Sequence, residues 1–210
     1  MARIPNGILG EFTGSIGTVI GYNYRGQKCM RTKPKKSNYK STPAQLKQQQ
    51  KFKLSHEFLY PLSGVTDLYF GHKIGAKSRT NLALSHLLLY AIKDIDDNLQ
   101  IDYQQVVITK GYLPAATITE VTLTDEELRI NWTPNGGRDL ALDSDKAKAV
   151  LFCKKQRMFF IPSTEVVRSE GAFTSPLPEN WKAKNCIVWF FFAKQDDSEC
   201  STSVNFYGLI

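Results

Sequence analysis

The sequence predicts an α+β protein in which a glycine-rich β-arm and two helices precede an antiparallel β-sandwich. Glycines recur every three or four residues from Gly7 to Gly21, a capped helical pattern begins at Thr42, and short strands separated by turns follow Asp97. A chain of 210 residues is long enough for one large domain or two small ones. We expect residues 1–110 to form the basic arm and helical region and residues 113–210 to form the sandwich.

The arm is predicted to be extended rather than helical. Each glycine costs a water-exposed helix about 1 kcal/mol relative to alanine, and five of them fall within fifteen residues. The pattern typical of two strands is "GTVIGYNYRGQKCMRTK", in which the strands meet at residues 24–27. Gly26 supplies the positive φ that a tight hairpin turn needs.

The helical region starts with a clear signal in "STPAQL". Thr42 is the expected N-cap, Pro43 takes the first helical position, and Gln45 stands where a capping box has Glu or Gln. This helix is expected to run from Thr42 to about Leu59. A second, leucine-rich helix is expected over residues 78–95, and its dense leucines predict burial on more than one side.

The C-terminal strands resemble those of a fibronectin type III or immunoglobulin-like domain. Leu128, Ile130 and Trp132 alternate in "ELRINWT", so Trp132 is the expected core residue. The stretch "VWFFFAKQDDSECSTSV" resembles the F–G hairpin of that fold. The cysteine pair that joins strands B and F in antibody domains is missing, which favours the fibronectin type III-like variant.

No catalytic, cofactor-binding or metal-binding residue is predicted, and we expect a protein that is not an enzyme. The chain has no Walker A loop, no G-x-G-x-x-G and no G-x-S-x-G. The stretch from Asp94 begins like a calcium loop but has Leu99 in place of the required glycine, so a solvated turn is expected there. None of the histidines has a neighbour at ligand spacing, so surface or packing roles are expected for His56, His72 and His86.

The four cysteines show no zinc-ligand spacing, which predicts free or buried thiols in a reducing compartment. They are Cys29, Cys153, Cys186 and Cys200. Cys186 and Cys200 occupy positions that a hairpin would allow to face each other, and the sequence leaves this pairing open.

The positive charge is concentrated near the N-terminus. Residues 1–54 hold eleven Lys and Arg and one acid, a net charge of +10, whereas the other 156 residues have a net charge of −3. This asymmetry indicates an anionic partner or a solvated face. The candidate polyanion-binding residues are Arg25, Lys28, Arg31, Lys33, Lys35, Lys36, Lys40, Lys47 and Lys51.

Four stretches occur in an order that resembles a Bacteroidota protein family of unknown function. They are "GTVIGYNYRGQKCMRTKPKK", "TPAQLKQQQKFKLSHEFLYPL", "VVITKGYL" and "LRINWTPNGG". The resemblance covers nearly the whole chain and implies a Gly-rich start, a basic R-x-K-P-K-K stretch, a TPAQL helix and a C-terminal sandwich. It implies no activity, cofactor or site residue.

These observations favour a non-enzymatic structural or protein-interaction protein, part of a larger assembly, whose partner is a second copy or another protein. The alternative is a module that binds nucleic acid or an acidic polysaccharide through residues 25–53. No secretory signal and no apolar run of about 20 residues is visible, so a cytoplasmic location and no membrane partner are expected.

Overall fold

The computed structural model describes residues 10–24, 26–35, 40–73, 75, 77–95, 97–137 and 140–207. The chain divides into two compact units, Met1–Pro43 and Ala44–Ile210. The boundary predicted near residues 110–113 falls inside the second unit. The α+β class and the antiparallel pairing of the strands agree with the prediction.

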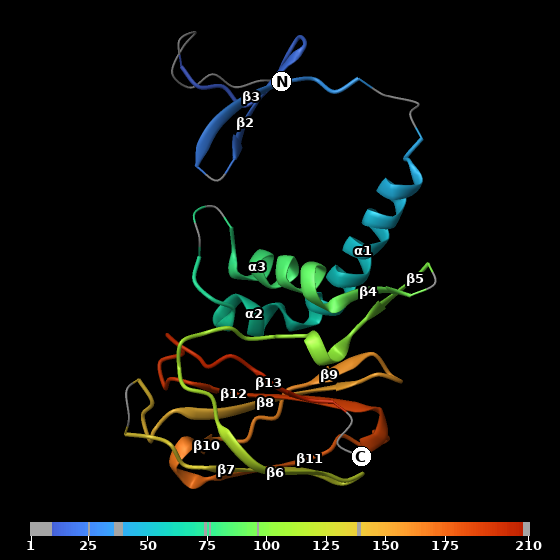
Figure 1. Cartoon of the computed structure of the whole chain (residues 1–210). Helices are drawn as coiled ribbons and strands as arrows, with labels where there is room; N and C mark the ends of the chain where they lie inside the picture. Colours follow the sequence, from blue (N-terminus) through green and yellow to red (C-terminus); the bar gives the residue numbers. More distant parts are fainter. Residues whose placement is uncertain are drawn as a thin grey trace. The chain divides into compact units, whose positions relative to one another are not determined.

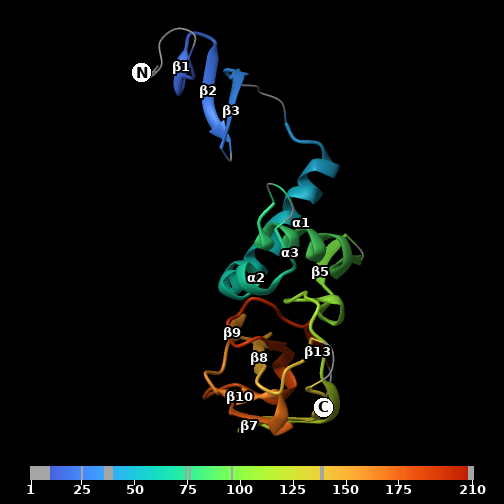
Figure 2. The same ribbon diagram turned by 90° about the vertical axis from the view of Figure 1, so that its left-hand side faces the viewer.

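The first unit contains a three-stranded antiparallel sheet in the order β1-β2-β3 (Figure 2). Its strands are β1 (Gly14–Ile16), β2 (Val19–Tyr24) and β3 (Gln27–Thr32). Tyr24 pairs with Gln27, and Gly26 has a φ of 85°. The predicted hairpin and the need for glycine in its turn are therefore confirmed.

The second unit begins with the predicted first helix, α1 (Pro43–Leu59). Pro61 then lies in a single 3-10 turn, because its ring removes a backbone donor and prevents α1 from continuing regularly. A short helix that the sequence pattern did not predict, α2 (Ser63–Tyr69), follows this turn.

The second predicted helix is shorter than expected. Helix α3 (Arg79–His86) starts after Ser78, whose side chain accepts a hydrogen bond from the Asn81 N–H at 3.2 Å, and it continues as a π-helical turn over Leu87–Ala91. The prediction of helix over residues 92–95 is wrong. These residues form β4 (Ile92–Ile95), which pairs with β5 (Asn98–Ile101) through a turn where Asp97 has a φ of 59°.

Two further antiparallel sheets complete the second unit. The smaller has the order β11-β7-β6, and the larger has the order β10-β8-β12-β13 with β9 also paired to β8. The strands are β6 (Thr117–Leu123), β7 (Glu127–Thr133), β8 (Lys146–Cys153), β9 (Met158–Phe160), β10 (Val166–Val167), β11 (Ala172–Pro176), β12 (Cys186–Ala193) and β13 (Val204–Phe206).

The larger sheet is the middle of three layers in the second unit, between the helices and the smaller sheet (Figure 1). Every residue of β12 is buried because both faces of this strand are covered. On one face, Phe190 packs against Trp132 of β7, with ring centroids 5.3 Å apart. On the other face, Phe191 packs against Tyr69 of α2 at 5.3 Å. The helices thus share a core with the sheets.

Trp132 lies where the strand alternation predicted. Its side chain is 3% exposed, and Leu128 and Ile130 are also buried. The indole Nε1–H donates a hydrogen bond to the carbonyl of Arg168 at 2.8 Å, which satisfies the one polar group of a buried ring. The predicted register of β7 is therefore confirmed.

Candidate functional site

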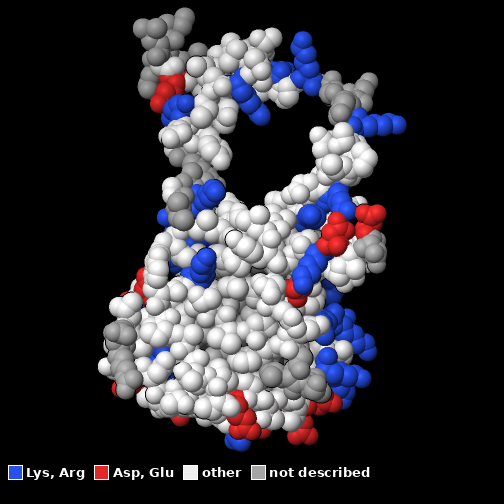
Figure 3. Space-filling model, viewed as in Figure 1, with Lys and Arg blue, Asp and Glu red and all other residues white. Residues whose placement is uncertain are grey.

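The basic residues of the arm are exposed, as expected from the lack of acids near them in sequence. Lys28 is exposed and pairs with Glu11 at 2.7 Å, and the Arg31 guanidinium lies 5.5 Å from the centroid of the Tyr22 ring. Lys33 and Lys35 are exposed and make no ion pair with a described residue. Figure 3 shows mainly Lys and Arg among the charged side chains of this unit.

The other predicted polyanion-binding residues are less well placed to form one continuous positive surface. Lys47 of α1 contacts Asp94 at 2.5 Å and Asp97 at 2.9 Å, and the hydrogen bonds that its ammonium group donates to these two carboxylates raise the Lys47 pKa. Its charge is therefore largely compensated within the second unit. Lys40 is exposed in the first unit and Lys51 is half-buried on α1, while Arg25 and Lys36 lie outside the described residues. Polyanion binding by this set stays a prediction.

The sheet of the first unit buries almost nothing of its own. Among the described residues of this unit, Gly21 alone is buried. Phe12 lies against it so closely that a Cβ at position 21 would stand 2.3 Å from the Phe12 carbonyl oxygen. Met30 is 72% exposed and Ile16 is 45% exposed. A small sheet without a core is only marginally stable by itself, and a partner that covers these two apolar side chains would stabilise it.

The outer edge of β3 offers free backbone groups. The Lys33 N–H donates to the Thr18 carbonyl at 2.6 Å, so hydrogen-bonded pairs alternate back along the β2–β3 ladder from this pair. The N–H and C=O groups of Lys28, Met30 and Thr32 consequently point away from β2. Among the described residues, β2 is the one strand that pairs with β3.

The second unit has an acidic strand edge. Within the described structure, β6 pairs with β7 alone. The Thr124 N–H donates to the Glu127 carbonyl at 2.9 Å, so the backbone groups of Val121 and Leu123 point outward by the same alternation. Glu120, Glu126 and Glu127 are exposed beside this edge and make no ion pair with a described residue.

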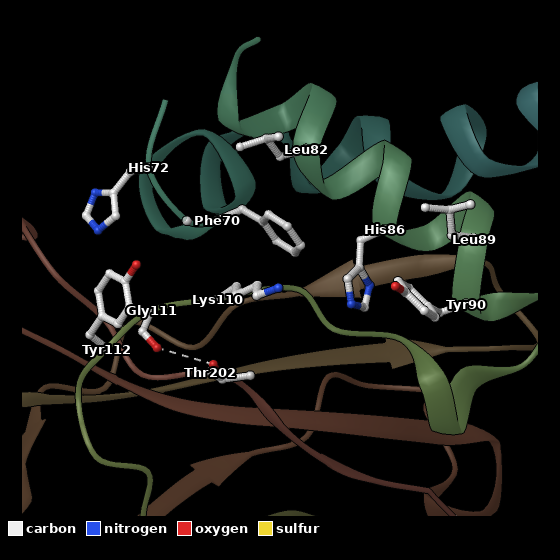
Figure 4. A pocket seen from close by; sticks show the side chains of 11 residues that line it. Phe70, His72, Leu82, His86, Leu89, Tyr90, Lys110, Gly111, Tyr112 and Thr202 are labelled. Carbon is white, nitrogen blue, oxygen red and sulfur yellow. Dashed lines mark hydrogen bonds between the residues drawn. The ribbon is translucent and has the colours of Figure 1, made fainter. Parts of the chain in front are cut away.

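An apolar pocket of about 530 Å³ lies in the second unit beside α3 (Figure 4). Phe70 and His72 from the segment after α2 line one side, and α3 with its π-helical turn lines another. The stretch from Lys110 to Tyr112 closes the third side. This stretch is held in place because the Gly71 N–H donates to the Lys110 carbonyl at 2.6 Å.

The polar residues that line this pocket are His72, His86 and Lys110 together with three that carry hydroxyl groups, Tyr90, Tyr112 and Thr202. His86 lies 5.8 Å from the Phe70 ring and 4.7 Å from the Tyr90 ring, and its Nδ1 is buried with no hydrogen-bond partner among the described residues. Burial, and secondarily the charge of Lys110, lowers the His86 pKa. His72 lies 3.4 Å from Glu199 and stacks on Tyr112.

The leucine-rich stretch at this pocket was expected to be buried on more than one side, and for two of its residues this is wrong. Leu89 is 74% exposed and Tyr90 is 60% exposed, because the π-helical turn presents both to the surface. Leu87 and Ala91 from the same turn are buried in the core.

A buried ion pair that the sequence analysis did not find lies between the two sheets. Arg168 and Asp145 are almost fully buried, and Arg168 Nε donates to Asp145 Oδ2 at 3.0 Å. The guanidinium also donates to the Pro114 carbonyl and lies 3.8 Å from the Phe192 ring centroid. Burial lowers the Arg168 pKa, against the opposing effect of Asp145. The pair has a structural role because it joins the segment after β10 to the residue before β8 inside the core.

No group of three or more His, Cys, Asp or Glu side chains is close enough to hold a metal ion among the residues that the structure describes. The four cysteines are free thiols. Cys186 lies opposite Cys153 across the β12–β8 ladder, while Cys200 pairs with Ala193, so Cys186 and Cys200 do not face each other. His56 is exposed on α1 and stacks between Phe52 of the same helix and Tyr60 of the 3-10 turn that follows, which is a packing role at the surface.

None of the helices in the described structure is long and apolar enough to cross a membrane. A family of unknown function, DUF6266, matches residues 11–207. The chain belongs to this family. No curated protein and no solved structure matches it. The expected membership of a family of unknown function is thereby confirmed.

Proposed function

We propose that the protein is a non-enzymatic structural protein whose copies join head to tail, with β3 of one copy adding to the β6 edge of the next. The observation that carries this proposal is the arm itself, a three-stranded sheet that leaves Ile16, Tyr24 and Met30 exposed. Such a sheet gains stability when a partner strand extends it and covers its side chains.

Charge complementarity supports the choice of β6 as the acceptor edge. Residues 1–43 hold eight Lys and Arg and one acid, so this unit has a net charge of +7, equal to that of the whole chain. Glu120, Glu126 and Glu127 offer opposite charge beside a free edge. The bulge between Ile118 and Glu120 interrupts β6, so we expect an added strand to pair regularly with residues 120–123.

The same charges argue against a symmetric dimer that joins two arms. Two units of net charge +7 repel each other, whereas a basic arm on an acidic edge is attractive. An interface between two different surfaces of one chain propagates into rings or filaments. The proposed assembly is therefore open-ended unless its geometry closes.

Sedimentation velocity over a range of protein concentrations tests the proposal. Met30→Pro removes an outward N–H from the edge of β3 without removing a β2–β3 hydrogen bond, so we expect it to weaken association at least tenfold. Met30→Ala keeps the N–H and is the matched control, with a smaller effect. Raising NaCl to about 1 M shortens the screening length to about 3 Å and is expected to weaken association as well.

Mixing two variants separates head-to-tail addition from other modes. The Met30→Pro chain keeps an intact β6 edge, and a chain with Glu120→Lys, Glu126→Lys and Glu127→Lys keeps an intact arm. Each variant alone is expected to stay monomeric, and their mixture is expected to form dimers and nothing larger. A wild-type protein that stays monomeric at every concentration, or a mixture that stays monomeric, would contradict the proposal.

The second candidate function is polyanion binding, supported by Lys33, Lys35 and Lys40, which are exposed and make no ion pair with a described residue. Replacement of Lys33 and Lys35 with Glu is then expected to abolish binding to heparin or duplex DNA and leave the melting temperature unchanged. Affinity for duplex DNA is expected to fall with salt, with a log–log slope of about −0.9 per phosphate neutralised. Absence of binding by the wild-type chain at low salt would exclude this function.

We also propose that the two facing sheets form a fibronectin type III-like sandwich, the finer form of the fold prediction. In immunoglobulin-like order, β6, β7 and β11 take the places of strands A, B and E, and β8, β12 and β13 take those of C, F and G. The strands between C and E, β9 and β10, pair with β8 rather than with β11. An experimental structure of the full chain that shows these strands in this order tests the assignment.

A further inference from the structure

We propose that the pocket beside α3 binds a small apolar carboxylate, with Lys110 as its counter-ion and His86 as a neutral hydrogen-bond partner. This site is separate from the β3 and β6 edges, so its test does not depend on self-association.

The size and the walls of the pocket fit a small apolar molecule. A volume of about 530 Å³ lies within the range of roughly 300–1,000 Å³ typical of small-molecule sites. The apolar and aromatic side chains of Phe70, Leu82, Leu89, Tyr90 and Tyr112 form most of its lining. Such walls favour an alkyl or aryl group over a sugar or a nucleotide.

The charge of the pocket selects an anion. Lys110 makes no ion pair with any residue that the structure describes, and neither Asp nor Glu lines the pocket. In Figure 4 the Lys110 side chain extends across the floor of the pocket with its nitrogen toward His86. A single uncompensated ammonium group favours one carboxylate, because a phosphate or diphosphate normally needs several donors or cations.

His86 complements this ammonium group as a neutral imidazole. The lowered pKa keeps the ring uncharged at neutral pH, so it adds a hydrogen bond without adding a second charge. Its Nδ1 is buried with no hydrogen-bond partner among the described residues, so we assign the hydrogen bond with the ligand to Nε2. A carboxylate therefore meets Lys110 from one side and His86 from the other.

The helix that carries His86 is irregular directly after this residue. Helix α3 passes into the π-helical turn Leu87–Ala91 directly after His86. This turn keeps Leu87 in the core while Leu89 and Tyr90 stand exposed at the pocket. Insertions of this kind lower helix stability and occur frequently at functional sites. The turn explains why two large apolar side chains are available to a ligand.

Isothermal titration calorimetry of the full chain with octanoate and with 1-octanol tests the charge requirement. Both probes have the same alkyl chain, and octanoate is expected to bind at least tenfold more tightly. Lys110→Met keeps the aliphatic stem and removes the charge, so it is expected to reduce octanoate affinity at least tenfold and to leave 1-octanol unaffected. Lys110→Arg is expected to restore most of the octanoate affinity.

Two controls keep the result specific to this pocket. Lys155→Met removes an exposed charge elsewhere in the second unit and is expected to leave octanoate binding unchanged. Leu89→Asp places a negative charge at the pocket and is expected to weaken octanoate binding, whereas Leu68→Asp alters an exposed leucine outside the lining and is not. Unchanged melting temperatures show that each variant is folded.

Equal affinity for the acid and the alcohol would overturn the proposal, as would octanoate binding that survives Lys110→Met. A wild-type protein that binds neither probe would overturn it too. Backbone amide shifts at Gly71 and Gly111 on addition of octanoate provide a second readout, since both residues line the pocket.

Discussion

The burial of some residues in the second unit follows from the sequence pattern of their own strand, whereas that of others depends on contacts between distant segments. Trp132 follows the alternation of β7, so its burial was predictable from the sequence. Arg168 and Asp145 were not, because they are 23 residues apart and their pairing depends on how the two sheets meet. A buried charge pair leaves no periodic signature in the sequence.

Trp132→Ala is expected to lower the free energy of unfolding by about 3–5 kcal/mol, because the surrounding side chains cannot fill the cavity left by an indole. The change also leaves the carbonyl of Arg168 without its indole donor. Chemical denaturation of the two proteins measures the difference. A loss below about 1 kcal/mol would mean that this part of the core is loosely packed.

The four cysteines are expected to differ in reactivity. Burial raises the pKa of Cys186 to about 12 and that of Cys200 to about 11, and Cys153 is also buried. A thiol-specific reagent at pH 8 is therefore expected to label Cys29 alone in the native chain, and all four cysteines after unfolding. The variant Cys29→Ser is expected to give no native labelling. Rapid labelling of Cys186 in the folded chain would contradict its burial.

At the scale of elements, a hydrogen-bonded cluster joins α2 to the large sheet. The Tyr69 hydroxyl donates to Asp197 Oδ1 at 2.5 Å, and Lys148 Nζ lies 3.2 Å from the same oxygen. Tyr69 ends α2, Lys148 lies on β8, and Asp197 lies in the turn after β12. Three segments distant in sequence are therefore fixed at one point.

This cluster predicts a pH dependence of stability. Burial alone would raise the Asp197 pKa, but hydrogen bonds from Tyr69 and Lys148 together lower it below its ordinary value. Because the folded-state pKa is depressed, its stabilisation is present above the unfolded-state pKa and is lost as the pH falls through the folded-state pKa. Asp197→Asn is expected to reduce stability at neutral pH and to unfold with a weaker pH dependence at acidic pH.

Asparagine is a fair replacement at this position because it tolerates the φ of 56° found there. Thermal unfolding of both proteins between neutral pH and the acid limb measures the effect. Parallel curves for the two proteins at all pH values would show that the carboxylate of Asp197 does not titrate with folding. Glu179→Gln, at an exposed carboxylate that makes no ion pair with a described residue, is the control.

Elements with strong local signals were predicted well, and those that depend on distant contacts were not. Helix α1 and the β2–β3 hairpin carry a proline at the first helical position and a turn glycine, which act within a few residues. The prediction of helix over residues 92–95 was wrong because Ile92 and Ile95 suit a strand as well as they suit a helix. Their pairing with β5 decides between the two states.

At the scale of the whole molecule, the sequence did not reveal that the helices cover the large sheet. Antiparallel sheets commonly have one solvated face, so a sandwich gives no general reason to expect a third layer. The one available signal was the unbroken apolar run of β12, "CIVWFFFA", since a strand with one solvated face alternates polar and apolar residues. The apolar pocket could not be predicted from the sequence either, because its lining comes from segments that are separate in the sequence.

The second unit is expected to fold without the arm. Both apolar cores are built from residues 58–206, so removal of residues 1–41 takes away no core side chain. The truncated chain, which keeps Thr42 as the residue before α1, is expected to melt within a few degrees of the full chain. Calorimetry measures this. A large drop in melting temperature would show that the arm stabilises the rest of the molecule.

The double burial of β12 has a consequence for synthesis on the ribosome. Eight consecutive apolar residues of high β-propensity are the kind of segment that associates between chains when it is left uncovered. This strand follows the helices, β6 and β7 in chain order, and these elements together cover its two faces. The growing chain therefore releases β12 only after the residues that bury both of its faces have emerged.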